Sequence, residues 1–175
     1  MKRGVYPGSF NPPTVGHVAI VEAAIRLHQL DCIDLVISEV ALAKPLIERP
    51  SLEERLQVIT ASFVDIPEVN ILRTSLQLIA DIARGYDVVV MGADKWGQIN
   101  DVKFYDSEAH MHESLASLPT LAVAPRSGEK VNESIRLDVP ETIAEVSSSS
   151  ARRTNFEWMT KAAQDFSGES GVWQD

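Results

Sequence analysis

The stretch YPGSFNPPTVGH, residues 6–17, decides the fold, because its glycines and prolines separate a short apolar run from a segment of helical period. Gly8 and Gly16 let the backbone pass close to a bulky anion, and the prolines stiffen the loop, so that binding loses little entropy. Thr14 and His17 place a hydroxyl and an imidazole on the first helical turn, whose N–H groups and positive dipole end favour phosphate. The stretch predicts a phosphate site at the carboxyl edge of a parallel sheet; the alternative is a Pro-rich loop capped by Thr14.

The rest of the chain alternates between short β-branched runs and segments of helical period. Strands separated by helices favour a parallel sheet with helices on both faces. We therefore expect the α/β class, as a single doubly wound, Rossmann-like domain with a parallel sheet of about five strands. The expected strands are 4–7, 32–40, 68–73, 86–92 and 118–125, and the expected helices are 15–30, 51–63, 75–85, part of 100–115, and 147–166.

Local signals support two of these helices. Ser51 and Glu54 have the spacing of a capping box, which predicts a helix start at that point. The helix at 75–85 is expected to bury Leu76 and to end at Gly85, because glycine readily adopts the left-handed conformation that ends helices.

The length suits one domain with a single core, which we place at residues 1–165. Residues 166–175 form a polar tail that is expected to be either mobile or packed by Trp173. The only cysteine is Cys32, so no internal disulfide can form.

Composition excludes several classes of function. The net charge of −9 argues against a protein that binds a nucleic-acid backbone, because such binding depends on Lys and Arg. Pro and Gly interrupt any signal peptide, and no run approaches the ~18 apolar residues of a membrane span. A cytoplasmic location is the resulting expectation.

A second polar cluster, VSSSSARR at residues 146–153, stands at the start of the last predicted helix. Its hydroxyls can cap the helix or bind phosphate, and Arg152 adds a bidentate fork that suits phosphate oxygens. The alternative is a flexible serine linker. Neither GxxxxGK[ST] nor GxGxxG is present, so the common nucleotide-binding loops are absent from the sequence.

Together the two segments resemble the nucleotidylyltransferases that carry an [HT]xGH signature. Residues 8–17 match the family pattern GxFxPxTxGH at each specified position, and residues 146–152 match ISSTxxR with Val for Ile and Ser for Thr. The resemblance extends from Tyr6 to Arg153. It departs from the family at Asn11, where Asp is frequent, and after Arg153, where the usual C-terminal extension is not matched.

The resemblance implies an enzyme that transfers a nucleoside monophosphate from ATP or CTP to a phosphate and releases pyrophosphate. Catalysis then consists of positioning and charge stabilisation, with Mg²⁺ carried by the nucleotide and no dedicated metal ligands in the protein. The implied catalytic residues are His17, Thr14, Lys44 and Arg152. The implied nucleotide-binding residues are Gly8, Ser9, Phe10, Gly16, His17, Gly92, Asp94, Ser147, Ser148, Ser149 and Arg152, and the implied acceptor-binding residues are Ser9, Lys44 and Trp96.

Two segments indicate different acceptors. YPGSF and the KP…SLEER segment around Lys44 resemble phosphopantetheine adenylyltransferases. GYDVVVMGADKW, residues 85–96, resembles the nicotinate and nicotinamide mononucleotide adenylyltransferases, in which Trp96 would stack on the pyridine ring; the alternative is a packing role. The phosphopantetheine adenylyltransferases usually carry an RGLR-like segment at the position of MGAD, and this sequence lacks it. The sequence therefore favours a pyridine mononucleotide as the acceptor, and hence a role in NAD biosynthesis.

Three alternatives stay open beside this hypothesis. They are a phosphopantetheine adenylyltransferase, a CTP-dependent cytidylyltransferase, and a regulator that binds nucleotide without catalysis. The expected partners are ATP and a phosphorylated small-molecule acceptor, with neither nucleic acid nor membrane, and with a homo-oligomer as a further expectation.

Overall fold

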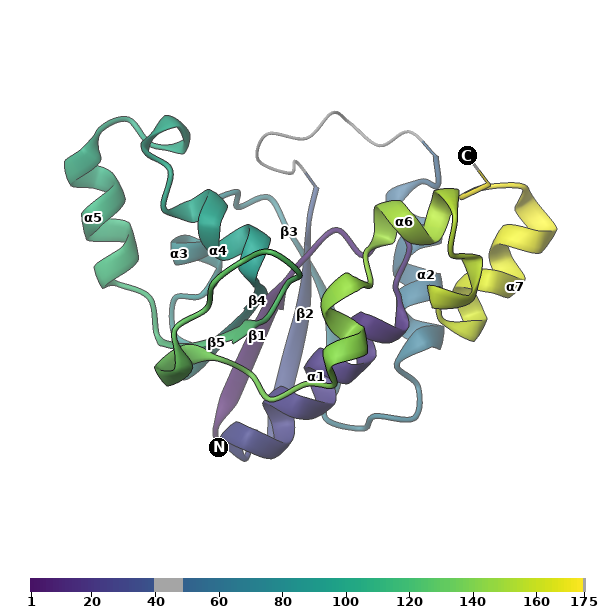
Figure 1. Cartoon of the computed structure of the whole chain (residues 1–175), viewed down its shortest axis with the longest axis horizontal. Helices are drawn as coiled ribbons and strands as arrows, with labels where there is room; N and C mark the ends of the chain where they lie inside the picture. Colours follow the sequence, from purple (N-terminus) through teal and green to yellow (C-terminus); the bar gives the residue numbers. More distant parts are fainter. Residues whose placement is uncertain (40–48, 175) are drawn as a thin grey trace.

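Five parallel strands form one sheet in the order β3-β2-β1-β4-β5 (Figure 1). The structure is a computed structural model that describes residues 1–39 and 49–174. The strand order reverses between β1 and β4, which is the switch point where doubly wound proteins bind ligands. The strands are β1 (Arg3–Pro7), β2 (Cys32–Ser38), β3 (Val69–Thr74), β4 (Val88–Gly92) and β5 (Thr120–Ala124).

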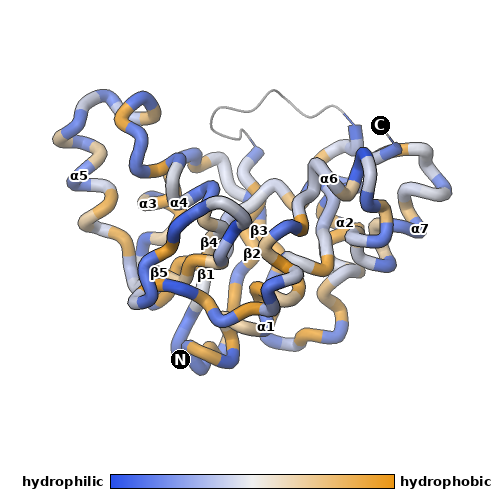
Figure 2. Tube along the Cα trace, in the orientation of Figure 1, coloured by the Kyte–Doolittle hydropathy of each residue, from blue (hydrophilic) through white to orange (hydrophobic). Residues whose placement is uncertain are grey.

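Helices cover both faces of the sheet, which confirms the expected doubly wound architecture (Figures 1 and 2). α1 and α2 pack with one apolar cluster, and α3 and α4 pack with a second cluster. The α-helices are α1 (Val15–His28), α2 (Leu52–Ser62), α3 (Ile79–Ile82), α4 (Ala93–Ile99), α5 (Glu108–Ala116), α6 (Ser148–Arg153) and α7 (Lys161–Ser170). The 3-10 helices are Val102–Phe104, Glu133–Ile135, Glu141–Glu145 and Phe156–Trp158.

The core explains why the strand sequences do not alternate between polar and apolar. Val88, Val89 and Val90 of β4 are completely buried although they point alternately to opposite faces. A central parallel strand covered by helices on both sides requires this continuous apolar run. β4 pairs with β1 in parallel, at the switch point of the sheet.

The capping box that the sequence predicts at the start of α2 is present. The Ser51 hydroxyl accepts from the Glu54 amide, and the Glu54 carboxylate accepts from the Ser51 amide at 2.8 Å. These two bonds pair N–H groups that have no partner within the helix.

The helix expected at 75–85 is much shorter in the structure, and Leu76 is 46% exposed rather than buried. The Leu76 amide donates to the Thr74 hydroxyl at 3.1 Å, and the Leu76 carbonyl accepts from the Ser38 hydroxyl at 2.8 Å. These side-chain bonds to the backbone compete with helix formation, so only Ile79–Ile82 is helical. Gly85, with φ of 85°, lies in the turn beyond α3.

The predicted helix at 147–166 is broken into α6, a 3-10 turn and α7. Met159 forms an isolated β-bridge with Thr14, and the Thr160 amide donates to the Pro13 carbonyl at 3.1 Å. These tertiary contacts draw the backbone out of the helix, and the Thr160 side chain then caps α7. The helix expected within part of 100–115 is confirmed as α5, with a 3-10 turn before it.

The C-terminal segment is packed, in agreement with the second of the two expectations. α7 runs across residue 165, and Trp173 is only 3% exposed, with its ring 5.5 Å from that of Phe166. Both belong to an apolar cluster that also includes Val58 of α2 and Met159. Residues 166–174 therefore pack with the body of the domain.

Within the described part of the chain, every helix is too short or too polar to cross a lipid bilayer.

Candidate active site

A cleft of about 430 Å³ opens beside the carboxyl ends of β1, β4 and β5, where the two signature segments meet. Both segments line it although they lie at opposite ends of the sequence. The residues implied for the site that line this cleft are Gly8, Ser9, Phe10, Thr14, Gly16, His17, Gly92, Asp94, Ser147, Ser148, Ser149 and Arg152. Lys44 lies outside the described residues.

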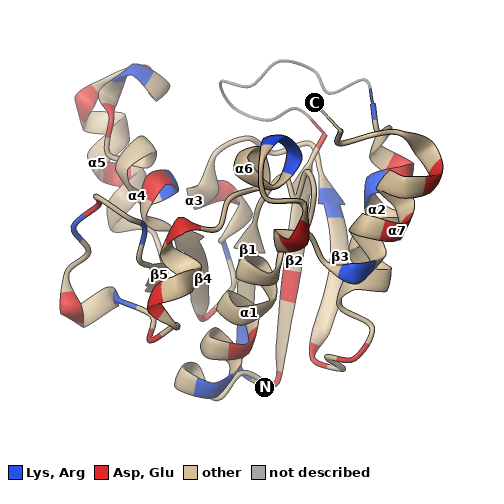
Figure 3. Ribbon diagram, turned by 45° about the vertical axis from the view of Figure 1, so that its right-hand side comes forward, with Lys and Arg blue, Asp and Glu red and all other residues tan. Residues whose placement is uncertain are grey.

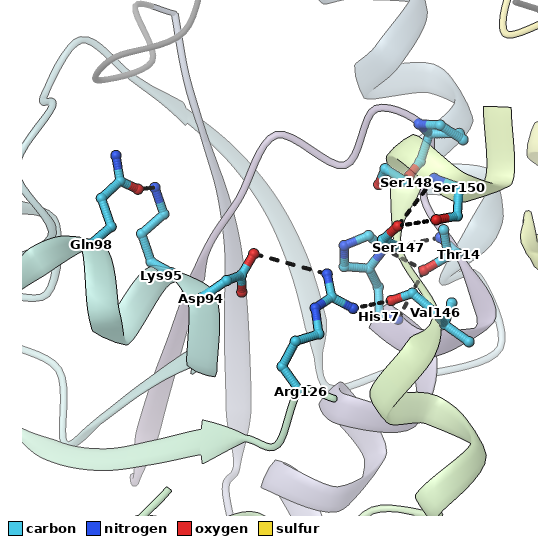
Figure 4. Close-up of polar contacts among 11 residues, drawn as sticks. Thr14, His17, Asp94, Lys95, Gln98, Arg126, Val146, Ser147, Ser148 and Ser150 are labelled. Atoms are coloured by element: carbon cyan, nitrogen blue, oxygen red, sulfur yellow. Dashed lines mark hydrogen bonds and ion pairs between the residues drawn. The ribbon is translucent and has the colours of Figure 1, made fainter. Parts of the chain in front are cut away.

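His17 is held in one tautomer by the start of its own helix. The Thr14 amide donates to His17 Nδ1 at 3.0 Å, and the Thr14 hydroxyl lies 2.9 Å from the same nitrogen (Figure 4). An amide can only donate, so Nδ1 accepts and the proton of the neutral imidazole lies on Nε2. Nε2–H is thus the group that can donate to a phosphate oxygen in the cleft.

Aromatic packing fixes the plane of the His17 imidazole. The Phe10 ring lies 4.9 Å from the imidazole and 5.3 Å from the Tyr6 ring, which it meets edge to face. Phe10 is 1% exposed and has a left-handed backbone with φ of 44°, which is uncommon for a bulky residue. Surrounding contacts must stabilise such a conformation, so the signature loop depends on its neighbours.

The second signature is bonded directly to the first. The Ser148 hydroxyl donates to the Pro12 carbonyl at 2.7 Å across 136 residues of sequence, and Arg152 donates to the Asn11 carbonyl. Ser147 caps α6 by accepting from the Ser150 amide at 3.0 Å. Capping by the serine run is therefore observed at Ser147, while Ser149 is exposed in the cleft.

Gly16 allows this close approach. A Cβ at Gly16 would lie 3.0 Å from Val146 Cγ1, the residue that begins the second signature. Val146 is 7% exposed, so it has little room to move. The absence of a side chain at Gly16 thus lets the start of α1 contact the residues that lead into α6.

Arg126 is a cleft residue that the sequence analysis missed. It follows β5 directly after Pro125, donates to the Val146 carbonyl, and lies with its NH2 atom 3.9 Å from Asp94 Oδ2 (Figure 4). It thus stands between α4 and the second signature. The signal in the sequence was a basic residue just after a buried parallel strand, the position at which such sheets present ligand-binding side chains.

The α4 side of the cleft carries Asp94, Lys95 and Gln98. The Asp94 carboxylate lies over Gly92, where a Cβ would come within 2.6 Å of Asp94 Oδ1. Lys95 Nζ donates to Gln98 Oε1 at 2.5 Å. Polar groups of both charges therefore line this side.

Trp96 does not line the cleft. It is half-buried and packs against the apolar cluster of α3 and α4, which favours the packing alternative. The aromatic residues that line this side are Phe104 and Tyr105. The Tyr105 hydroxyl donates to the Ile99 carbonyl at 2.8 Å, and burial raises the pKa of Tyr105, so the phenol stays protonated at neutral pH.

The charges around the cleft suit a polyanion although the chain as a whole is acidic. Figure 3 shows basic residues on α6 near the carboxyl ends of the central strands. The guanidinium groups of Arg126 and Arg152 line the cleft together with the His17 imidazole and the serine hydroxyls. Among residues 1–39 and 49–174, no three His, Cys, Asp or Glu side chains gather into a metal site.

Fold and site together define an α/β protein with a cleft lined by cationic and hydroxyl side chains at the switch point of its sheet. A family model described as cytidylyltransferase-like matches residues 5–154, which is most of the chain. The chain therefore belongs to the cytidylyltransferase-like family, and its resemblance to the nucleotidylyltransferases is confirmed.

Curated relatives are named phosphopantetheine adenylyltransferase. That of Dictyoglomus thermophilum is 38% identical over 91 residues, which are 52% of this chain and 52% of that protein. That of Flavobacterium psychrophilum is 30% identical over 142 residues, which are 79% of this chain and 88% of that protein. The chain thus spans about half the length of the Dictyoglomus relatives and 88% of the Flavobacterium relative.

Solved structures share the fold at low sequence identity. Plasmodium falciparum nicotinic acid mononucleotide adenylyltransferase complexed with NaAD has a TM-score of 0.69 and is 17% identical, covering 99% of this chain and 98% of its own. The same enzyme complexed with APC has a TM-score of 0.71 at 15% identity, covering 98% and 96%. At this identity the likeness concerns the fold.

Proposed function

We propose that this protein transfers AMP from ATP to the phosphate of a small molecule and releases pyrophosphate. The observation that carries the proposal is the meeting of His17 and Arg152 in one cleft, joined through the signature loop. Family membership supports the class of reaction.

In the proposed reaction, an oxygen of the acceptor phosphate attacks the α-phosphorus of ATP. The bond between the α-phosphorus and the bridging oxygen breaks, and pyrophosphate leaves with the electron pair. The acceptor oxygen is already ionised, so no covalent enzyme intermediate is needed. The Nε2–H of His17 and the guanidinium of Arg152 stabilise the negative charge that develops on the phosphates. Mg²⁺ would arrive with the triphosphate.

The acceptor that we propose first is nicotinate or nicotinamide mononucleotide. Gly92 and Asp94, from the GYDVVVMGADKW segment at residues 85–96, line the cleft. The aromatic residues Phe104 and Tyr105 line the same side. A flat pyridine ring suits such an aromatic surface. The second candidate is 4′-phosphopantetheine, which the names of the curated relatives support.

The test is pyrophosphate release with purified protein, MgCl₂ and each acceptor in turn, with ATP and CTP compared. The proposal expects ATP-dependent release with one of the two mononucleotides and formation of the corresponding dinucleotide. Release with 4′-phosphopantetheine would support the second candidate, and preference for CTP would support the cytidylyltransferase alternative. Binding of ATP without release under any acceptor would support the regulator alternative.

A further inference from the structure

The loop of the first signature is held from outside. Pro12 and Pro13 have no N–H group, so the loop has fewer backbone donors than carbonyl acceptors. Four consecutive residues, Asn11 to Thr14, are instead bonded by the C-terminal part of the chain. The contacts are Arg152 to the Asn11 carbonyl, the Ser148 hydroxyl to the Pro12 carbonyl, the Thr160 amide to the Pro13 carbonyl, and a β-bridge between Thr14 and Met159.

A fifth contact reaches the same loop from the turn after α7. The indole Nε1 of Trp173 donates to Asn11 Oδ1 at 2.5 Å, across 162 residues of sequence. The indole is almost completely buried. Asn11 is therefore held twice, at its carbonyl by Arg152 and at its side chain by Trp173.

The turn that carries Trp173 has its own internal bonds. Gly171 ends α7 in the left-handed conformation, and Trp173 itself has a φ of 64°. The buried Ser167 hydroxyl donates to the Val172 carbonyl at 2.6 Å, and the Gln174 side chain donates to the Ser167 carbonyl at 2.8 Å. A left-handed backbone conformation is unfavourable for a tryptophan in isolation. The hydrogen bonds of this turn stabilise it, and in this conformation the indole contacts Asn11.

The position of Asn11 links this turn to the chemistry of the cleft. Asn11 follows Phe10, whose ring packs on the imidazole of His17, and it lies three residues before Thr14, which bonds His17 Nδ1. Movement of Asn11 would therefore reach both groups that orient the imidazole. It would also move the carbonyl that Arg152 contacts.

We propose that Trp173 is a positioning residue for the reaction in this cleft. Its indole N–H holds the Asn11 side chain, and through the loop it sets the orientation of His17 and Arg152. This inference rests on the proposed adenylyl transfer for its kinetic part. It assigns a role to the C-terminal turn, which lies beyond the residues that the family model matches.

The test compares Trp173→Phe with Trp158→Phe. Trp158 belongs to the same apolar cluster, and within the described part of the chain its indole makes no hydrogen bond. Both variants replace an indole of this cluster by a phenyl ring, Trp173 being buried and Trp158 half-buried, but only the first loses the bond to Asn11. We expect Trp173→Phe to lower kcat/KM by about tenfold, because a slightly misplaced group weakens transition-state contacts, and Trp158→Phe to keep it.

Two further measurements separate positioning from stability. The ¹⁵N NMR signals of the His17 imidazole should shift in Trp173→Phe and stay in place in Trp158→Phe. They are measured well below the melting temperature of either variant, so a difference in stability does not affect the comparison. The kinetic effects of Trp173→Phe and Asn11→Ala should not add in the double variant, because both remove the same bond. Identical His17 signals and identical kcat/KM in the two tryptophan variants would overturn the proposal.

Failure of the proposed function is recognised separately. If the wild-type protein transfers AMP to none of the acceptors, the adenylyl transfer is rejected. The positioning role is then decided by the His17 signals and by the affinity for α,β-methylene-ATP. A Trp173→Phe variant with the His17 signals and analogue affinity of the wild type would reject the positioning role as well.

Discussion

His17 has two roles in the structure, and they involve different atoms. Nδ1 accepts from the Thr14 amide at the start of α1, while Nε2 carries the proton that can meet a phosphate. A sequence motif alone shows only that a histidine is present. The cap geometry assigns a role to each nitrogen.

We predict that His17→Asn lowers kcat/KM by about 100-fold or more, the usual effect of removing one charge-stabilising donor. The asparagine oxygen can still accept from the Thr14 amide, so the midpoint of thermal unfolding should change little. His17→Ala should lose both the activity and part of the stability, because it also removes the cap acceptor. Wild-type kcat/KM in His17→Asn would contradict the proposed mechanism.

Arg126 allows a second test at the level of one side chain. Arg126→Gln can keep a donor to the Val146 carbonyl but removes the charge between Asp94 and the second signature. We expect kcat/KM with ATP to fall about ten- to hundredfold, the equivalent of one charge-assisted hydrogen bond.

The control for Arg126 is Arg153→Gln, because Arg153 is an exposed arginine at the end of α6 that does not line the cleft. It should retain the kcat/KM of the wild type. An equal loss in both variants would show that overall charge, rather than the position of Arg126, matters.

Among the elements, α2 illustrates how a local signal can be tested by titration. Hydrogen bonds from Ser51 lower the pKa of the Glu54 carboxyl below its ordinary 4.5. Ionised Glu54 therefore stabilises the fold fully above about pH 4.5, and this contribution is lost as the pH falls through the lower folded-state pKa.

We predict that Glu54→Gln lowers the free energy of unfolding at neutral pH, and that its difference from the wild type disappears in acid. Urea unfolding between about pH 3 and 7 measures the difference. Glu53→Gln is the matched control, since Glu53 lies in the same first turn outside the capping box. A pH-independent difference for Glu54→Gln would contradict the role of the charge.

The elements that the sequence predicted correctly are those with strong local signals. The apolar run of β4 and the Ser51 capping box depend on residues close together in the chain. The helix at 75–85 failed because Ser38, a residue of β2, bonds Leu76. The helix at 147–166 failed because Thr14 and Pro13 bond residues 159 and 160. Both errors involve partners that are remote in sequence, although the Thr74 hydroxyl, two residues from Leu76, also contributes to the first.

For the whole molecule, the contact between the two signatures is the feature most open to test. We predict that Gly16→Ala destabilises the protein by about 1–3 kcal/mol, the usual effect of overpacking, and lowers kcat/KM. The added methyl would press on Val146, 3.0 Å from its Cγ1. Urea unfolding and the pyrophosphate assay measure the two effects.

The double variant Gly16→Ala with Val146→Ala provides the control, because the smaller residue makes room for the methyl. It should recover part of the activity that Gly16→Ala loses. If Gly16→Ala alone has wild-type stability and activity, the close approach of the two segments does not matter for function.

The sequence by itself determined the doubly wound class, the five strands and the two signature segments. Each of these depends on periodicity or on neighbouring residues, whose interactions are local. Only the tertiary structure decided that Arg126 joins the site, that Trp96 packs outside the cleft, and that Trp173 reaches Asn11. These relations depend on how the chain returns to the same edge of the sheet. No local sequence pattern encodes these contacts, because they are set by the packing of helices on strands far apart in sequence.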